Sequence, residues 1–263
     1  MKSLTKPLTI ITTYGRFDLT KRMLTSLEPS QHLLDTVIID NGNPKDQCDW
    51  EVAWSRDNGA TTVLVGRNIG CPRGLNLALQ SRKPGQPVIK LDNDILMPDG
   101  PQWLYGVERL VENFDVNKYP VAMVGACFEP VDMVRVKSVS TWELKNLYQV
   151  FPLIGHAVYH TALFMERVGY FDVVHPDHLY GFEDNIMSTK AAMLGFNILA
   201  WHGWVVEDIQ RRSAIEKRDD HVRAMRPYYN NRIKGLSLGG SFYTGPDGYP
   251  ARRMENESFS RVA

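Results

Sequence analysis

The sequence predicts an α/β protein with a mostly parallel central sheet, and three observations lead to that prediction. Short apolar runs alternate with segments of helical spacing through about the first hundred residues. Each apolar run stops at polar residues, as expected for strands whose carboxyl ends carry binding loops. The 263 residues are 43% hydrophobic and 23% charged, so the chain can bury the core that such a sheet requires.

The predicted elements of the first half alternate between strand and helix. Strands are expected at residues 8–12, 36–39, 61–65 and 88–91, and helices at 18–27 and 74–80. The four strands end in Thr13-Tyr14-Gly15-Arg16, Asp40-Asn41-Gly42, Arg67-Asn68 and Asp92-Asn93-Asp94. Polar residues at four strand ends indicate a binding edge rather than four unrelated loops.

The second half is less regular. Helices are expected at residues 103–114 and 184–194, the latter stopped by Gly195, and strands at 121–125 and 198–201. Residues 130–160 contain short β-prone runs. A charged helix is expected at 215–233, which Pro227 should break or bend. The tail from Ser237 onward is predicted to be loop-like or partly disordered.

Charge and cysteine content narrow the class of protein. Lys and Arg together number 30 and so do Asp and Glu, so no net field favours nucleic acid as a partner. Three scattered cysteines fit neither a disulfide framework nor a zinc knuckle and favour a reducing compartment. The apolar stretch near the N-terminus is too short for a signal peptide, and no run approaches a membrane helix. We therefore expect a soluble cytoplasmic protein, whose oligomeric state the sequence does not indicate.

The stretch Asp92-Asn93-Asp94 directly follows the fourth predicted strand. Side chains two positions apart in an extended segment point the same way, so both carboxylates can converge on one hard divalent cation such as Mg²⁺ or Mn²⁺. A cation at this edge would suit a diphosphate, whose charge it neutralises. An isolated D-x-D motif is more often a solvated turn that caps a helix, so the context of the motif decides.

That context consists of five segments in a fixed order. They are TIITTYGRFDLTKRMLTSL, TVIIDNG, VGRNIGCPRGLNLAL, VIKLDNDILMPDG and ERVGYFDVVHPDHLYGFEDNIMSTKAAMLGFNI. Together they resemble the family 2 glycosyltransferases of the GT-A fold, from about Leu8 to about Asp208. The resemblance implies a Rossmann-like sheet flanked by helices, with a smaller mixed acceptor-side subdomain. Residues 1–97 would bind the nucleotide sugar, 98–235 would form the acceptor-binding and catalytic half, and 236–263 a loop-like tail.

The resemblance also implies a site for a nucleoside-diphosphate sugar, with a UDP-type donor favoured. The loop beside the base and ribose corresponds to Thr12, Tyr14 and Arg16. Asp40 corresponds to the residue that accepts a hydrogen bond from the base. The segment that closes over the nucleotide corresponds to Asn68, Gly70 and Asn76.

For the metal, the resemblance assigns Asp92 and Asp94 to the cation that holds the donor's diphosphate, with Asn93 between them. Many relatives carry a further His ligand after the strand that here begins G-F-N-I. That place falls near Asp208, while His202 arrives about six residues earlier. Asp208 is therefore the favoured third ligand and His202 the reserve, with Mn²⁺ or Mg²⁺ as the expected cofactor.

A second acidic site is Gly181-Phe182-Glu183-Asp184. Inverting sugar transfer needs a base that takes the proton of the acceptor hydroxyl. The resemblance assigns this role to the acidic pair, with Asp184 as first choice and Glu183 as reserve. An ordinary helix cap is the alternative. The expected activity is metal-dependent transfer of a sugar to a glycan or other hydroxyl acceptor, with inversion.

Other functions stay open. A nucleotidyltransferase also pairs a parallel sheet with a carboxylate-bound metal, but TTYGRFD lacks the glycine-rich, basic triphosphate loop expected of one. A non-catalytic nucleotide-sugar-binding protein and a retaining enzyme on the same fold are the further alternatives. His156 and His160 are four residues apart, like helical zinc ligands, but VYHTALF is typical of a core, so we expect structural roles for both.

Overall fold

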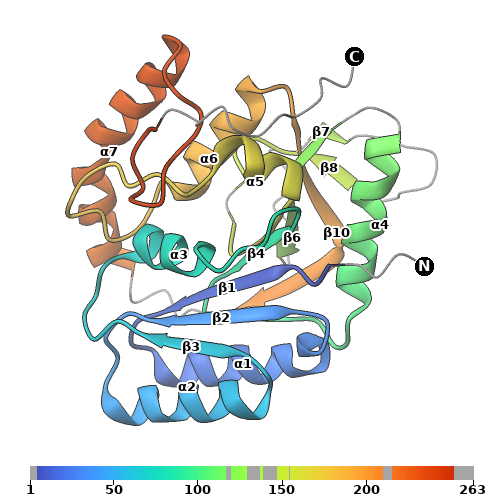
Figure 1. Ribbon diagram of the computed structural model, residues 1–263, viewed down its shortest axis with the longest axis vertical. Helices are drawn as coiled ribbons and strands as arrows, with labels where there is room; N and C mark the ends of the chain where they lie inside the picture. Colours follow the sequence, from blue (N-terminus) through green and yellow to red (C-terminus); the bar gives the residue numbers. More distant parts are fainter. Residues whose placement is uncertain are drawn as a thin grey trace.

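A sheet of ten strands lies at the centre of the protein (Figure 1). The structure is a computed structural model that describes residues 5–116, 120–128, 137–138, 147–153, 155–209 and 215–251. In these residues the strand order is β3-β2-β1-β4-β9-β6-β10-β8-β7, and β5 pairs with β10 outside that path. The strands are β1 (Leu8–Thr13), β2 (Asp35–Asp40), β3 (Thr61–Leu64), β4 (Val88–Leu91), β5 (Ile95–Leu96), β6 (Val121–Phe128), β7 (Lys137–Ser138), β8 (Leu147–Gln149), β9 (Ala157–His160) and β10 (Asn197–Asp208).

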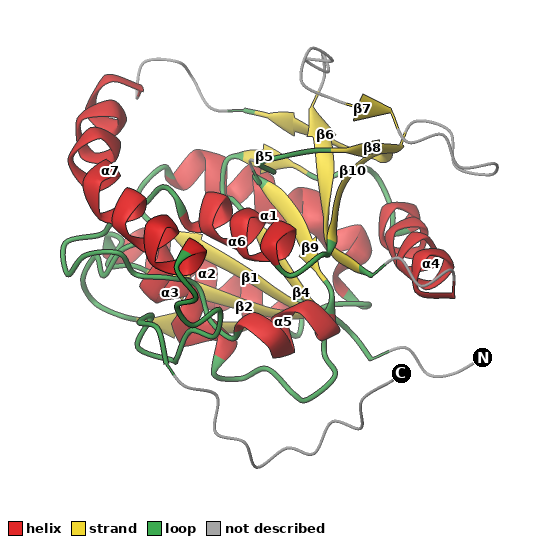
Figure 2. Ribbon diagram, turned by 90° about the horizontal axis from the view of Figure 1, so that it is seen from above, coloured by secondary structure: helices red, strands yellow, loops and turns green. Residues whose placement is uncertain are grey.

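Helices cover both faces of the sheet. Alternate strand residues enter opposite cores: Ile11 and Ile89 pack with α1, α2 and α4, whereas Ile10 and Val88 pack with α3, α5 and α6. Figure 2 shows α4 and α7 at opposite sides of the sheet. The helices are α1 (Phe17–Gln31), α2 (Lys45–Asp57), α3 (Cys71–Leu79), α4 (Gln102–Val116), α5 (Ala162–Val168), α6 (Glu183–Met193) and α7 (Ile215–Ser237).

The direction of the strands determines where a site can form. Strands β3, β2, β1 and β4 run parallel, so their carboxyl ends meet at one edge. β9 lies antiparallel between β4 and β6, and it therefore begins at that same edge. The predicted α/β fold is confirmed, with parallel pairing among β3, β2, β1 and β4 and between β6 and β10. The antiparallel pairings made by β9, β8 and β5 were not predicted.

Most predicted elements form, with bounds that differ by a few residues. All six strands predicted at named positions are present, and the one expected at 198–201 is longer, reaching Asp208. The five predicted helices also form. The sequence missed α2, α5 and β5. The apolar side chains of α2 are few, so its helical period is weak; of its aromatic residues, only Trp54 is fully buried.

Two predictions about the C-terminal part need correction. α7 does not break at Pro227 but continues to Ser237. Pro227 is exposed, so the carbonyl group that loses its donor can be hydrated. The segment after α7 is loop-like as expected, yet it is packed, since Thr244 is fully buried and bonds to Val168 and Tyr170 through its backbone. Residues 252–263, and most of the β-prone run between 129 and 146, lie outside the described residues.

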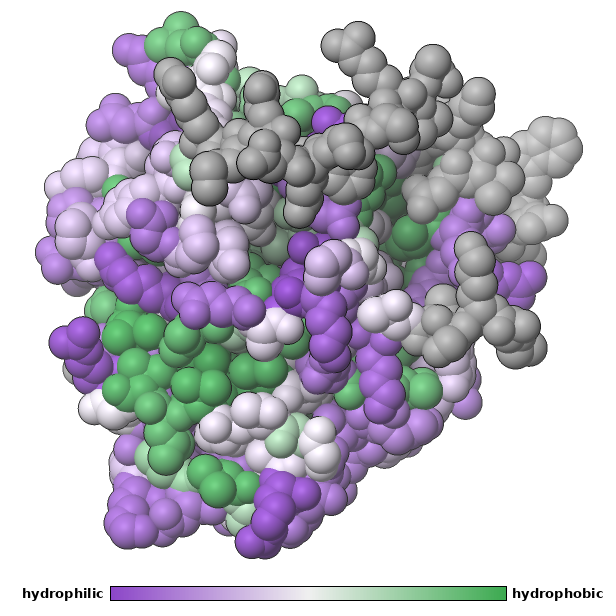
Figure 3. All heavy atoms as spheres, viewed as in Figure 1, coloured by the Kyte–Doolittle hydropathy of each residue, from purple (hydrophilic) through white to green (hydrophobic). Residues whose placement is uncertain are grey.

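Among the described residues, no helix is both long enough and apolar enough to cross a membrane. Partly buried Val63, Val65 and Leu77 pack against the core on the α3 side. Figure 3 shows a hydrophobic area on the face of the molecule near α3 and β3. β3 is an edge strand, and that position explains its incomplete cover.

A buried ion network joins α6, α7 and the C-terminal segment. The ammonium group of fully buried Lys190 pairs with Asp172 and donates to the hydroxyl of Thr244 at 2.7 Å. Arg232 of α7 donates from Nε to the other Asp172 oxygen at 2.6 Å and from Nη2 to the carbonyl of Ser241 at 2.9 Å. One buried carboxylate thus holds two cations from different helices.

Asp172→Asn should lower the free energy of unfolding by about 3–5 kcal/mol, because it leaves Lys190 and Arg232 buried without a counter-charge. Urea denaturation followed by circular dichroism measures the change. Asp49→Asn is the matched control, since its pair with Lys45 is exposed and should leave the midpoint almost unchanged. Equal effects of the two substitutions would show that the network does not join these elements.

Candidate active site

The site lies where β4 ends and β9 begins. Leu91 pairs with Ala157 in the antiparallel register. Asp92, which follows Leu91, and His156, which precedes Ala157, therefore also face each other. The backbone N–H of Asp92 donates to the carbonyl of His156 at 2.8 Å and extends the pairing by one position. The register thus brings together two residues that are far apart in the sequence.

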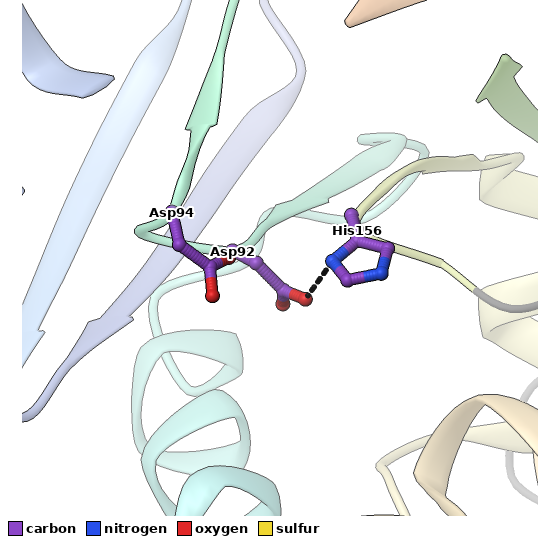
Figure 4. Close-up of side chains that lie close together, drawn as sticks. All are labelled: Asp92, Asp94 and His156. Atoms are coloured by element: carbon purple, nitrogen blue, oxygen red, sulfur yellow. Dashed lines mark ion pairs between the residues drawn. The ribbon is translucent and has the colours of Figure 1, made fainter. Parts of the chain in front are cut away.

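Asp92, Asp94 and His156 form a group that fits a divalent cation. One ligand atom from each lies within 4.8 Å of the others. Figure 4 shows the Asp92 carboxylate pointing at the His156 ring, with Asp94 beside it, and Asp92 Oδ2 is 3.2 Å from His156 Nδ1. Two carboxylates and one imidazole are a donor set that suits Mn²⁺ well and Mg²⁺ through the oxygens. The sequence analysis expected a structural role for His156 from its sequence neighbours, and the strand register places its ring beside Asp92.

The surroundings shift the pKa values of Asp92, Asp94 and His156 in different directions. Burial opposes ionisation of Asp92, but Lys90 and His156 together lower its pKa to about 2. Burial and the Asp92 charge raise the pKa of Asp94, whose residue is only 5% exposed. The hydrogen bond to Asp92 raises the pKa of His156 against the effect of burial. A buried carboxyl whose neighbour is already ionised would be stabilised in its charged form by a bound cation.

Arg16 reaches the same group from the other side. Gly15 and Arg16 both have left-handed backbone angles, with φ of 62° and 56°, and Arg16 caps the N-terminus of α1. This corner directs the guanidinium to Asp94, where Nη1 donates to Oδ2. Tyr14, beside it, is more than half exposed. Arg16 therefore lies at the predicted cation position, while Tyr14 is accessible to a ligand.

The acidic pair begins α6. Gly181 and Phe182 have positive φ values, and this tight corner places Glu183 and Asp184 in the first helical turn. Burial raises the pKa of Glu183 to about 7 and also raises that of Asp184. Glu183 Oε2 and Asp184 Oδ1 are buried without a hydrogen-bond partner among the described residues. Both carboxyls thus combine a raised pKa with one buried oxygen that makes no hydrogen bond among the described residues.

Lys90 connects the two acidic sites. Its Nζ lies 2.9 Å from Asp184 Oδ2 and 3.3 Å from Asp92 Oδ1. Burial disfavours its charge, yet the surrounding carboxylates, Asp184 first, raise its pKa well above the ordinary value. The cation motif and the acidic pair are therefore neighbours around one ammonium group.

Several residues that the sequence analysis expects at the nucleotide make hydrogen bonds that hold the loops in which they lie. Fully buried Asp40 accepts the backbone N–H groups of Gly42 and Asn43 at 2.8 and 2.9 Å, and its other oxygen lies 2.9 Å from the Cys48 thiol. The Asn76 amide exchanges two hydrogen bonds with the Phe171 backbone. These side chains hold their loops through the polar groups that a base or ribose would otherwise bind.

The N-x-G segment behaves in the same way. Asn68 accepts the N–H of Gly70 at 2.9 Å. Gly70 has φ of 87°, and a Cβ there would lie 2.5 Å from the carbonyl oxygen of His178. Only glycine fits this close approach of the loop to the backbone of His178 and Leu179. Thr12 is half-buried and its hydroxyl donates to the Cys71 sulfur at 3.5 Å.

Three predicted residues remain: Asn93, expected to contact the nucleotide sugar, Asp208, the expected third metal ligand, and His202, its reserve. Asn93 donates to the Thr20 hydroxyl at 3.0 Å and so faces α1. Asp208 pairs with Ile95 where β10 meets β5, and its charge contributes to the raised pKa of Asp94. His202 lies in the irregular stretch of β10 where the register with β6 shifts, outside the group formed by the two Asp residues and His156 among the described residues.

Comparison with solved structures identifies the architecture as the GT-A glycosyltransferase fold, as the sequence predicted. The structure matches a mannosyltransferase from Pyrobaculum calidifontis in complex with GDP-Man and Mn²⁺, with a TM-score of 0.63 and 20% identity over 89% of this chain and 69% of that one. It also matches GalNAc-T7 with UDP, GalNAc and Mn²⁺, with a TM-score of 0.62 and 16% identity over 81% of this chain and 45% of that one.

A third match is residues 1–349 of S. aureus TarS in complex with UDP-GlcNAc, with a TM-score of 0.58 and 16% identity over 85% of this chain and 65% of that one. This chain therefore spans less than two thirds of the latter two proteins. No protein-family model and no curated protein sequence matches it. At this level of identity the comparisons show a shared fold and not a shared chemistry. Any functional conclusion therefore has to rest on the geometry of the site residues described above.

A buried glutamate from α2, missed by the sequence analysis, supports the loop after β1. Glu51 accepts the Thr13 hydroxyl at 3.1 Å and the amides of Gln47 and Asn43 at 2.8 and 3.4 Å. Asn43 accepts the N–H of Gly15, and Gln47 donates to its carbonyl. Both polar groups of the Gly15 backbone are thus held through Glu51, which explains how the loop keeps its left-handed corner.

Burial raises the pKa of Glu51 to about 7, so the folded state keeps a proton that the unfolded state has lost between about pH 4.5 and 7. This carboxyl should therefore make the protein less stable as the pH rises through that window. Between pH 4.5 and 8 the unfolding free energy of the wild type should fall by about 3 kcal/mol more than that of Glu51→Gln. Urea titrations at the two pH values measure the difference, and parallel pH dependences of the two proteins would contradict it.

Proposed function

We propose that the protein transfers a sugar from a nucleoside-diphosphate donor, UDP-type by preference, to a hydroxyl of a glycan or other acceptor, with inversion. The observation that carries the proposal is the closeness of a cation-binding group, Asp92, Asp94 and His156, to a buried acidic pair at the start of a helix. Matching structures with bound GDP-Man, UDP or UDP-GlcNAc support the kind of donor.

The donor would lie along the edge formed by the ends of β1, β2 and β4. Exposed Tyr14 supplies a flat surface for the base or ribose, and Arg16, now on Asp94, is placed to contact the diphosphate. Asp94, Asp92 and His156 would hold the divalent cation, with Asp208 near it on β10. Bound there, the cation supplies positive charge to the departing diphosphate.

The acceptor hydroxyl would lie beside α6. Asp184 accepts the proton of that hydroxyl as the oxygen attacks the anomeric carbon, and the sugar–phosphate bond breaks on the opposite face. The new glycosidic bond thus forms with inverted configuration. Lys90 occupies Asp184 Oδ2, so the proton would go to Oδ1, which is buried and makes no hydrogen bond among the described residues. Glu183 is the reserve base, since its pKa of about 7 also suits proton transfer.

Calorimetry with UDP, GDP, dTDP and CDP tests the donor site. One nucleotide should bind with Mn²⁺ and at least tenfold more weakly with EDTA, and Asp94→Ala should remove the metal dependence by losing roughly 10–100-fold in Mn²⁺ affinity.

His156→Ala should weaken Mn²⁺ binding similarly, whereas the matched control His202→Ala should not. If Asp208→Ala removed Mn²⁺ binding and His156→Ala did not, the third ligand would be Asp208. If no nucleotide bound in either condition, the proposed function would be wrong.

Asp184→Asn should lower kcat for sugar transfer by about 10²–10⁴-fold while nucleotide affinity stays within a few-fold, because the base acts only in the transition state. UDP release from a panel of UDP-sugars and hydroxyl acceptors measures the rate. Glu183→Gln is the matched comparison and should cost less. A larger loss for Glu183→Gln would exchange the two roles, and full activity in both variants would exclude this pair as the base.

A further inference from the structure

A lysine in the middle of the sheet is unusual, and Lys90 lies on the central strand β4 with its side chain only 3% exposed. Its neighbours on the strand, Ile89 and Leu91, are fully buried apolar residues. Burying an ammonium group is costly unless it is paired and hydrogen-bonded. The contacts of Lys90 therefore indicate what keeps it there.

Each of the three N–H groups of the ammonium has an acceptor. Nζ lies 2.8 Å from the Gly155 carbonyl, 2.9 Å from Asp184 Oδ2 and 3.3 Å from Asp92 Oδ1. These acceptors come from three separate segments: the end of β4, the start of α6 and the turn before β9. Gly155 directly precedes His156, so the same ammonium also anchors the segment that carries the imidazole.

Strand geometry explains how one side chain reaches all three. Lys90 points to the same face of β4 as Val88, the face covered by α3, α5 and α6. Asp92 follows two positions later and therefore lies on that side as well. Since Lys90 has no donor left and almost no exposed surface, it does not contact a substrate itself and can act only through the groups that it holds.

We propose that Lys90 is a positioning residue for the reaction, a fixed cation that sets the place of the Asp184 carboxylate relative to the cation-binding carboxylate Asp92. This inference rests on the proposed function. By binding Asp184 Oδ2, Lys90 fixes the rotation of the carboxyl group, and with it the place of Oδ1. Its charge offsets the repulsion between Asp92 and Asp184, which would otherwise push the base away from the cation site.

This role has a consequence that a merely structural lysine lacks. The ammonium is a positive charge 3.3 Å from a carboxylate that binds the metal, so it opposes cation binding. Removing the charge should therefore keep or increase Mn²⁺ affinity while it impairs catalysis. Loss of packing alone would reduce both.

Lys90→Met, which keeps the length and the apolar stem, tests the proposal. Its kcat should fall by roughly 100-fold, the cost of a displaced catalytic group, with the KM for the donor within a few-fold of the wild type. Its Mn²⁺ affinity, measured by calorimetry, should equal or exceed that of the wild type. In the Asp184→Asn background the same substitution should change kcat by less than about threefold, because both changes remove the same function.

If Lys90→Met does not fold, two other variants replace it. The double variant Lys90→Met/Asp184→Asn, which loses one positive and one negative charge, serves for the Mn²⁺ measurement. Lys90→Arg serves for the kinetic measurement. Arg keeps the charge but not the three converging contacts, so wild-type Mn²⁺ affinity and a reduced kcat are expected. A wild-type kcat in Lys90→Met or Lys90→Arg, or loss of Mn²⁺ binding in a folded variant, would overturn the positioning role. Absence of turnover in the wild type would overturn the proposed function instead.

Discussion

The antiparallel register between β4 and β9 is the constraint on which the rest of the site depends. It places His156 opposite Asp92 and brings Gly155 within reach of Lys90. A shift by one residue would turn every side chain of β9 to the opposite face and separate these groups. Both strands are fully buried, so the two hydrophobic cores fix the register. Packing of apolar residues therefore positions the polar centre.

The centre is an arrangement of negative charge that the fold has to stabilise. Asp92, Asp94, Glu183 and Asp184 gather around the edge of β4, and all four are largely removed from water. Lys90 lies between two of them and Arg16 pairs with a third. Further positive charge would stabilise the ionised forms, and this is the physical basis for expecting a cation and a diphosphate ligand there. The same burial makes the acidic pair basic enough to accept a proton.

The sequence predicted the features that depend on local pattern. Apolar runs ending in polar residues predicted the strands and the position of Asp92 and Asp94 at a strand end, and the resemblance predicted the GT-A fold that the comparisons confirm. The sequence did not predict the features of the site that depend on contacts between segments far apart in the chain. His156 meets Asp92 only through strand register, so its local sequence suggested a core residue. The Asn76 side-chain amide donates one hydrogen bond to the Phe171 carbonyl and accepts one from the Phe171 N–H, which no pattern within a single segment reveals. α2 was missed because three of its four buried residues, Gln47, Glu51 and Ser55, are polar, and only Trp54 is apolar.

Anomalous scattering from crystals grown with Mn²⁺ and UDP tests the central claim most directly. Data collected at the manganese edge locate the ion without reference to activity. The account predicts one peak within bonding distance of the Asp94 carboxylate, in the group formed with Asp92 and His156, and UDP diphosphate oxygens on its open side. A nucleotide bound at this edge with no manganese beside Asp94, or manganese bound elsewhere on the chain, would contradict it.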